Sequence, residues 1–120
     1  MTSSSLHAAL RAGASGLYAL EGGTGLVIAH GAWTSRQDFG CFIHHGPGTA
    51  AIDWEAVIAA LDAGLLPASG GEKRMLRLAA SLAGDVPVRL GDAVTGIDQR
   101  NADLVIAAVL HATGRRQFPR

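Results

Sequence analysis

The chain has 120 residues, of which 48% are hydrophobic and 17% are charged, so a disordered or polyelectrolyte chain is excluded. This length predicts a single domain over residues 1–120 with one apolar core. Ten basic and ten acidic residues give a formal net charge of zero, which provides no general attraction for nucleic acid or for an anionic membrane.

The N-terminal part is predicted to form a short helix and then a β-hairpin. Residues 1–5 are polar and are expected to be a flexible tail, and residues 6–12 are expected to be helical. The apolar segments 17–20 and 26–30 are predicted to be two strands. Between them lies the glycine-rich segment 21–25, and glycine accepts the positive φ that hairpin turns need.

The next segment is predicted to form a helix and a loop. Thr34 or Ser35 can cap this helix. The apolar side chains that fall on its buried face are Phe39, Phe42 and Ile43. A loop is expected at residues 46–48, and a third short strand at residues 49–52 stays open.

Two helices are predicted after this loop, because capping residues stand just before apolar stripes of helical period. Asp53 can cap the first of them, and Gly64 ends it. Ser69 and Glu72 have the spacing of a capping box, in which the serine hydroxyl and the glutamate carboxylate each accept a backbone N–H. This box opens a helix that ends at Gly84.

The rest of the chain is predicted to be helical as well. Residues 86–90 are expected to be extended, residues 92–96 to form one helical turn, and Asp98 to cap the last helix. Residues 115–120 form a basic tail that is expected to be flexible. The sequence therefore predicts an α+β fold, with a small antiparallel sheet packed by Ala/Leu-rich helices and a helical C-terminal half.

The last helix is apolar on two faces, whereas a surface helix needs only one apolar stripe. Either this helix is central to the core, or it is shared with a second subunit in a homodimer, and both alternatives stay open. The residues assigned to such an interface are Leu104, Val105, Ile106, Ala108, Val109 and Leu110.

A nucleic-acid interface is an alternative use of the helical half. From residue 72 to residue 120 there are eight basic and five acidic residues, a net charge of +3. Arginine, glutamine and asparagine are residue types that read base edges. The candidate residues are Lys73, Arg74, Arg77, Gln99, Arg100 and Asn101.

A third alternative is a small metal-binding protein or histidine-dependent enzyme, because zinc prefers cysteine, histidine and carboxylate ligands. The residues that would have to converge are His30, Cys41, His44, His45 and Asp53. No combination of nucleophile, base and orienting group is visible, so no catalytic residue, metal ligand or cofactor is assigned.

Cysteine usage and hydropathy bear on location. Cys41 is the only cysteine, which excludes an intramolecular disulfide, and its neighbours Phe39 and Phe42 predict a buried thiol. Residues 1–16 lack the apolar core of a secretory signal, and no apolar run approaches the length that a bilayer requires. A cytoplasmic protein without membrane association is expected.

Residues 69–74, Ser-Gly-Gly-Glu-Lys-Arg, resemble the signature region of ABC-type ATPases. The chain has no G-x-x-x-x-G-K-[ST] loop to hold nucleotide phosphates, and Ala93 stands where that family has its catalytic glutamate. We therefore regard the match as false and the residues as a helix cap.

Residues 71–83 and 93–101 resemble small proteins encoded in actinobacterial genomes, and residues 30–54 are similar to them in character. No activity is known for these proteins, so the resemblance assigns no site. The sequence thus favours a non-enzymatic interaction or regulatory module that pairs with itself or another protein.

Overall fold

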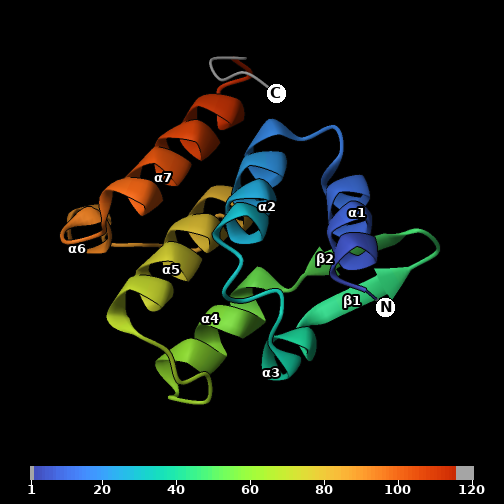
Figure 1. Ribbon diagram of the computed structural model, residues 1–120, viewed down its shortest axis with the longest axis horizontal. Coiled ribbons are helices and arrows are strands. Elements are labelled where there is room, and N and C mark those ends of the chain that lie inside the picture. Colours follow the sequence, from blue (N-terminus) through green and yellow to red (C-terminus); the bar gives the residue numbers. More distant parts are fainter. Residues whose placement is uncertain (1, 116–120) are drawn as a thin grey trace.

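The computed structural model describes residues 2–115, which form seven helices and one two-stranded sheet (Figure 1). In chain order the elements are α1 (Ser3–Ala14), α2 (Tyr18–His30), α3 (Gln37–Gly40), β1 (Ile43–Gly46), β2 (Thr49–Ile52), α4 (Trp54–Asp62), α5 (Gly70–Gly84), α6 (Leu90–Val94) and α7 (Gln99–Ala112). The α+β class and the helical C-terminal half are confirmed. No helix within these residues is long and apolar enough to cross a membrane.

The hairpin predicted over residues 17–30 is wrong, because this segment forms one continuous helix, α2. Its glycines do not serve a turn, since neither Gly22 nor Gly23 has a positive φ. They allow close helix packing instead. A Cβ on Gly23 would lie 2.5 Å from the Ala83 Cβ, and one on Gly22 would lie 2.7 Å from the Ala108 carbonyl oxygen.

The antiparallel hairpin lies later in the chain than expected. β1 pairs with β2 in a register that sets Ile43 opposite Ile52 and Gly46 opposite Thr49. The strand left open at residues 49–52 is therefore confirmed, and its partner is the segment that was expected to end a helix. That helix is reduced to the single turn α3, whose Phe39 is fully buried.

The capping signals of the later helices are confirmed. The Asp53 carboxylate accepts the Ala56 N–H over 3.1 Å at the start of α4. At the start of α5, Ser69 and Glu72 form a complete capping box. Asp98 accepts the Asn101 N–H at the start of α7 over 2.8 Å. These bonds satisfy backbone donors that have no partner inside the helix.

Two boundaries differ from the prediction. α1 begins at Ser3, within the segment that was expected to be a tail, and the Thr2 hydroxyl caps it by accepting the Ser5 N–H over 3.1 Å. The single turn near residue 92 begins two residues earlier than expected, as α6. The predicted tail 115–120 lies outside the described residues except for Arg115.

The core is built around α2, which packs against α1, α5 and α7 and lies between α1 and α7 in Figure 1. Among the residues with almost no exposed area are Leu10, Trp33, Phe39, Val57, Met75 and Leu76. The Trp33 indole N–H donates to the Glu72 carbonyl over 3.0 Å and so joins the segment after α2 to α5. Because α2 occupies the centre, α7 lies at one edge of the molecule.

Candidate functional site

The residues predicted as an interface divide between the two sides of α7. Ala108 is 6% exposed, and Leu104 and Val105 pack partly against the core. Ile106 and Val109 point the other way and keep 51% and 48% of their area exposed. We call Ile106, Val109 and the half-buried Leu110 the outer stripe of α7.

Other exposed apolar side chains lie near this helix. Seven large apolar residues are exposed in the part of the chain that the structure describes. Six of them belong to α7, to α6 or to the start of α2, namely Leu17, Tyr18, Leu90, Val94, Ile106 and Val109. The seventh, Leu65, follows α4. The Tyr18 ring meets His111 of α7 edge to face, at 6.1 Å between ring centroids.

The six residues predicted to contact nucleic acid lie on α5 and α7, and several are engaged inside the molecule. The Arg77 guanidinium pairs with the Asp62 carboxylate over 2.6 Å. Arg100 donates to the carbonyl of Ala29 over 3.0 Å, at the end of α2. Gln99 donates to Asp103 on its own helix over 2.8 Å. The other three candidate residues are Lys73, Arg74 and Asn101.

An arginine-rich hollow of about 680 Å³ lies beside α5 and the segment that follows it. Arg74, Arg77 and Arg89 line it, together with Asp62 and Asp92. Two of these arginines have carboxylate partners, since Arg77 pairs with Asp62 and Arg89 lies 3.6 Å from Asp92. The hollow therefore has a small excess of positive charge, carried by Arg74.

The five residues considered for a metal or a histidine-dependent reaction form at most one pair. His44 Nε2 lies 3.4 Å from an Asp53 carboxylate oxygen, and both side chains are well exposed. That contact and the Ala56 N–H hold the pKa of Asp53 below its ordinary value, the N–H having the larger effect. Over residues 2–115 no three His, Cys, Asp or Glu side chains are placed to hold a metal ion together.

Cys41 and His30 differ in their surroundings. Cys41 is exposed, so the prediction of a buried thiol is wrong: Phe39 is fully buried and Phe42 packs partly against the core, but the cysteine between them faces solvent. His30 ends α2, where its Nδ1 is buried without a hydrogen-bond partner in the described chain. Burial, and secondarily the nearby Arg100 guanidinium, lower the pKa of His30.

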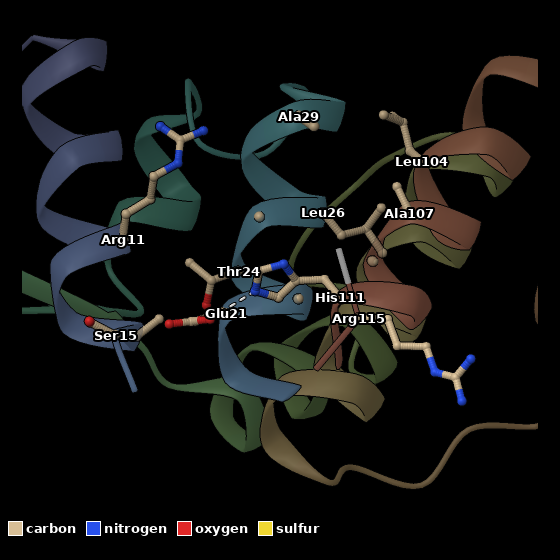
Figure 2. A pocket seen from close by; sticks show the side chains of 14 residues that line it. Arg11, Ser15, Glu21, Thr24, Leu26, Ala29, Leu104, Ala107, His111 and Arg115 are labelled. Carbon is tan, nitrogen blue, oxygen red and sulfur yellow. Dashed lines mark hydrogen bonds and ion pairs between the residues drawn. The ribbon is translucent and has the colours of Figure 1, made fainter. Parts of the chain in front are cut away.

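A pocket of about 510 Å³ lies between α1, α2 and α7 (Figure 2). Its floor is the side of α2 that carries the small residues Gly22, Gly25 and Ala29. Arg11 and Ser15 line it from the α1 side. The lining residues from α7 are Leu104, Ala107, Ala108 and His111.

The polar centre of this pocket is an ion pair between two helices. His111 Nε2 lies 2.8 Å from Oε1 of Glu21, and Figure 2 draws this contact as a dashed line. The other carboxylate oxygen of Glu21 accepts the Gly16 N–H over 2.9 Å. The bond from His111 first, and the bond from Gly16 second, lower the pKa of Glu21, so this carboxylate is ionised at neutral pH.

This pocket was missed from the sequence because Glu21 was assigned to a turn between two strands. A helical interpretation places Glu21, Gly25 and Ala29 on one face, since they are spaced by four residues. That spacing is the signal that could have revealed the floor of the pocket. The partner His111 is too far away in the chain for any local pattern to indicate it.

Comparisons with protein-family models, with curated proteins and with solved structures give no match to this chain.

Proposed function

We propose that the chain is a cytoplasmic, non-enzymatic interaction module that forms a homodimer through the outer stripe of α7. The observation that carries this proposal is the exposure of Ile106 and Val109, 51% and 48%, in the middle of a helix whose opposite side already packs in the core. A helix in this position ordinarily presents charged or polar residues to water. An apolar surface of this kind favours contact with a partner.

The order of residues along the outer stripe supports a second copy of the chain as that partner. The stripe is apolar in its centre and polar at both ends, with Gln99 and Asp103 before it and Thr113 after it. Two α7 helices that meet antiparallel about a two-fold axis would set Ile106 against Val109 of the partner subunit, and the polar ends would remain in water. Such a self-complementary surface suits the symmetry of most homodimers.

The exposed thiol of Cys41 supports the cytoplasmic part of the proposal. A free, exposed cysteine is compatible with a reducing compartment, where thiols are kept reduced. Over residues 2–115 no three potential metal ligands lie together, so the metal part of the third hypothesis gains no support from geometry.

Nucleic-acid binding remains the second candidate, and the arginine-rich hollow is the observation that favours it. Arg74 is available there to a phosphate, because it has no carboxylate partner within residues 2–115, and Arg89, although it lies 3.6 Å from Asp92, is 91% exposed. Self-association ranks first because Arg77 and Arg100, two of the six candidate contacts, already bond within the molecule.

Sedimentation velocity of the purified protein tests the proposal. At about 100 µM a dimer with a dissociation constant of about 1 µM is mostly assembled, so we expect the mass of two chains. Ile106→Glu places a charge in the centre of the stripe and should give a monomer with an unchanged circular dichroism spectrum. Leu65→Glu is the matched control, because Leu65 is 69% exposed and lies away from α7.

Two results would overturn self-association: a monomeric wild-type protein at this concentration, or an Ile106→Glu variant that still has twice the chain mass. The nucleic-acid alternative is tested on the same samples by fluorescence anisotropy with a labelled DNA duplex at two salt concentrations. Binding that weakens steeply with salt, and that Arg74→Ala and Arg89→Ala reduce, would move that alternative to first place.

A further inference from the structure

We propose that the pocket between α1, α2 and α7 binds a small amphipathic carboxylic acid, with its apolar part on Leu26, Leu104 and Ala107 and its carboxylate beside Arg11. This goes beyond self-association, because the pocket is formed by the inner flank of α7 and not by its outer stripe. The argument rests on the size of the pocket, its lining and its balance of charges.

The size and lining of the pocket suit a small organic ligand. Its volume of about 510 Å³ lies within the range of about 300–1,000 Å³ that is typical of ligand sites. The walls are mainly apolar, and two of the polar lining residues, Glu21 and His111, are paired with each other. A site of this type buries the hydrocarbon part of a ligand and fixes its polar group by a small number of contacts.

The charges around the pocket leave an unfilled place for an anion. Glu21 is the only carboxylate among the lining residues, and both of its oxygens already accept hydrogen bonds, one from His111 and one from Gly16. Arg11 and Arg115 also line the pocket, and neither is paired with a carboxylate of residues 2–115. Two solvent-exposed guanidinium groups therefore border the pocket without a carboxylate partner, and a ligand carboxylate would give one of them a charge-assisted pair.

The directions of the side chains favour Arg11 as the contact. In Figure 2 the Arg11 side chain leaves α1 on the side of α2, whereas Arg115 extends away from Glu21 and His111. The guanidinium of Arg11 can bind a carboxylate with two parallel hydrogen bonds. In the same view Leu26, Leu104 and Ala107 lie together on the other side of the pocket, where an apolar chain would rest.

His111 is a polar part of the pocket wall, held in place by Glu21. Its Nε2–H is used by Glu21, because an ionised carboxylate can only accept. The Glu21 carboxylate thus fixes the orientation of the imidazole, as a carboxylate beside a histidine commonly does.

The charge balance also selects against other occupants. A nucleotide or polyphosphate carries several negative charges and needs several cations, whereas this pocket offers one guanidinium directed toward it. A neutral apolar molecule would gain no charge-assisted contact with the exposed guanidinium of Arg11. A helix of another protein would have to cover the Glu21–His111 pair with apolar side chains, at the cost of its remaining hydration.

The test is a titration of the ¹⁵N-labelled protein with sodium octanoate, followed by NMR, with octan-1-ol and octylammonium chloride as probes of equal chain length. We expect octanoate to shift the amides of Gly25, Ala107 and His111, and to bind about tenfold more tightly than octan-1-ol, because the alcohol cannot pair with the guanidinium. Octylammonium should bind more weakly still.

Three variants locate the site. Arg11→Gln should weaken octanoate binding about tenfold, to the level of octan-1-ol. Gly25→Leu should abolish binding by filling the pocket floor, and it should fold, because a Cβ at Gly25 meets nothing within 4 Å and leucine favours a helix. Arg89→Gln, in the arginine-rich hollow, is the matched control and should bind as the wild type does.

The proposal is overturned if octanoate causes no shifts, if octan-1-ol binds as tightly as octanoate, or if Arg11→Gln leaves the affinity unchanged. Shifts confined to the outer stripe of α7 would also overturn it, because they would assign octanoate to the exposed apolar surface. The same titration on Ile106→Glu separates this proposal from self-association, since the pocket should bind octanoate whether that variant is a monomer or a dimer.

Discussion

The imidazole of His111 in the last turn of α7 bonds through Nε2 to the Glu21 carboxylate in the first turn of α2, over 2.8 Å, although the two residues are 90 positions apart in the chain. The contact joins an edge helix to the central helix. It also forms the polar centre of the pocket, and the Gly16 N–H on the other oxygen of Glu21 ties it to the turn before α2. The Glu21 carboxylate thus links α2, α7 and the turn before α2.

Glu21→Gln should therefore destabilise the fold by about 1 kcal/mol at neutral pH, since a hydrogen bond to a charged group is replaced by a neutral one in a partly exposed position. The effect should depend on pH. The pKa of Glu21 is lowered in the folded protein, so its contribution is present above the ordinary value of 4.5 and is lost as the pH falls through the folded-state pKa.

Urea denaturation of both proteins across this acidic range measures the effect. The difference between wild type and Glu21→Gln should be largest near neutral pH and should shrink in acid. Glu55→Gln is the matched control, because Glu55 is exposed on α4. An equal loss of stability in both variants would mean that the bond between α2 and α7 contributes nothing.

Two glycines of α2 should respond in opposite directions to the same substitution. A Cβ on Gly23 would lie 2.5 Å from the Ala83 Cβ and 2.6 Å from the Ala79 carbonyl oxygen, so Gly23→Ala must push α2 away from α5. Such overpacking costs about 1–3 kcal/mol. A Cβ on Gly25 meets nothing within 4 Å, so Gly25→Ala should stabilise the helix by about 0.5–1 kcal/mol.

Thermal or urea unfolding of both variants and of the wild type measures these changes. The midpoint should fall for Gly23→Ala and rise for Gly25→Ala. The pair controls for helix propensity, because both substitutions are made in the same helix. If Gly23→Ala is as stable as Gly25→Ala, the close approach of α2 and α5 does not exist in solution.

The helices of the C-terminal half could be predicted because their signals are local. The carboxylate or hydroxyl that caps each helix lies within three residues of the N–H that it accepts, as at Asp53, Ser69 and Asp98. Such signals do not depend on the rest of the fold. The two apolar faces of α7 could also be predicted, from the periodicity of its apolar residues. Which of these faces stays exposed depends on the packing of α7 against α2, and the sequence of α7 alone does not determine it.

The N-terminal half could not be predicted in the same way. The segment 21–25 has low helix propensity, and its glycines suit a turn in isolation. It is helical because Gly22 and Gly23 let α5 and α7 approach its backbone closely, and this is a property of the tertiary structure. For the same reason the pocket was not predicted, since the spacing that forms its floor has meaning only if α2 is a helix.

The capping box of α5 should be worth about 1 kcal/mol. The Ser69 hydroxyl accepts the Glu72 N–H over 3.1 Å, and the Glu72 carboxylate accepts the Ser69 N–H over 2.9 Å. Ser69→Ala removes the first acceptor and should lower the free energy of unfolding by about that amount. Ser69→Asp keeps an acceptor at the cap and should restore most of it. A Ser69→Asp variant as unstable as Ser69→Ala would contradict this role.

Acid should destabilise the protein through His30 at the end of α2. Burial first, and then the Arg100 guanidinium, lower the pKa of this histidine below 6.5, while Glu72 and Asp98 act in the opposite direction. As the pH falls through 6.5, the unfolded chain takes up a proton that folded His30 does not accept, so stability declines until the lower folded-state pKa is reached.

His30→Gln should therefore flatten the decline in unfolding free energy between about pH 7.5 and about pH 5.5, the range where histidine titrates. His45→Gln, at an exposed position on β1, should leave the decline unchanged. Equal pH profiles for wild type and His30→Gln would show that folded His30 is protonated as readily as it is in the unfolded chain.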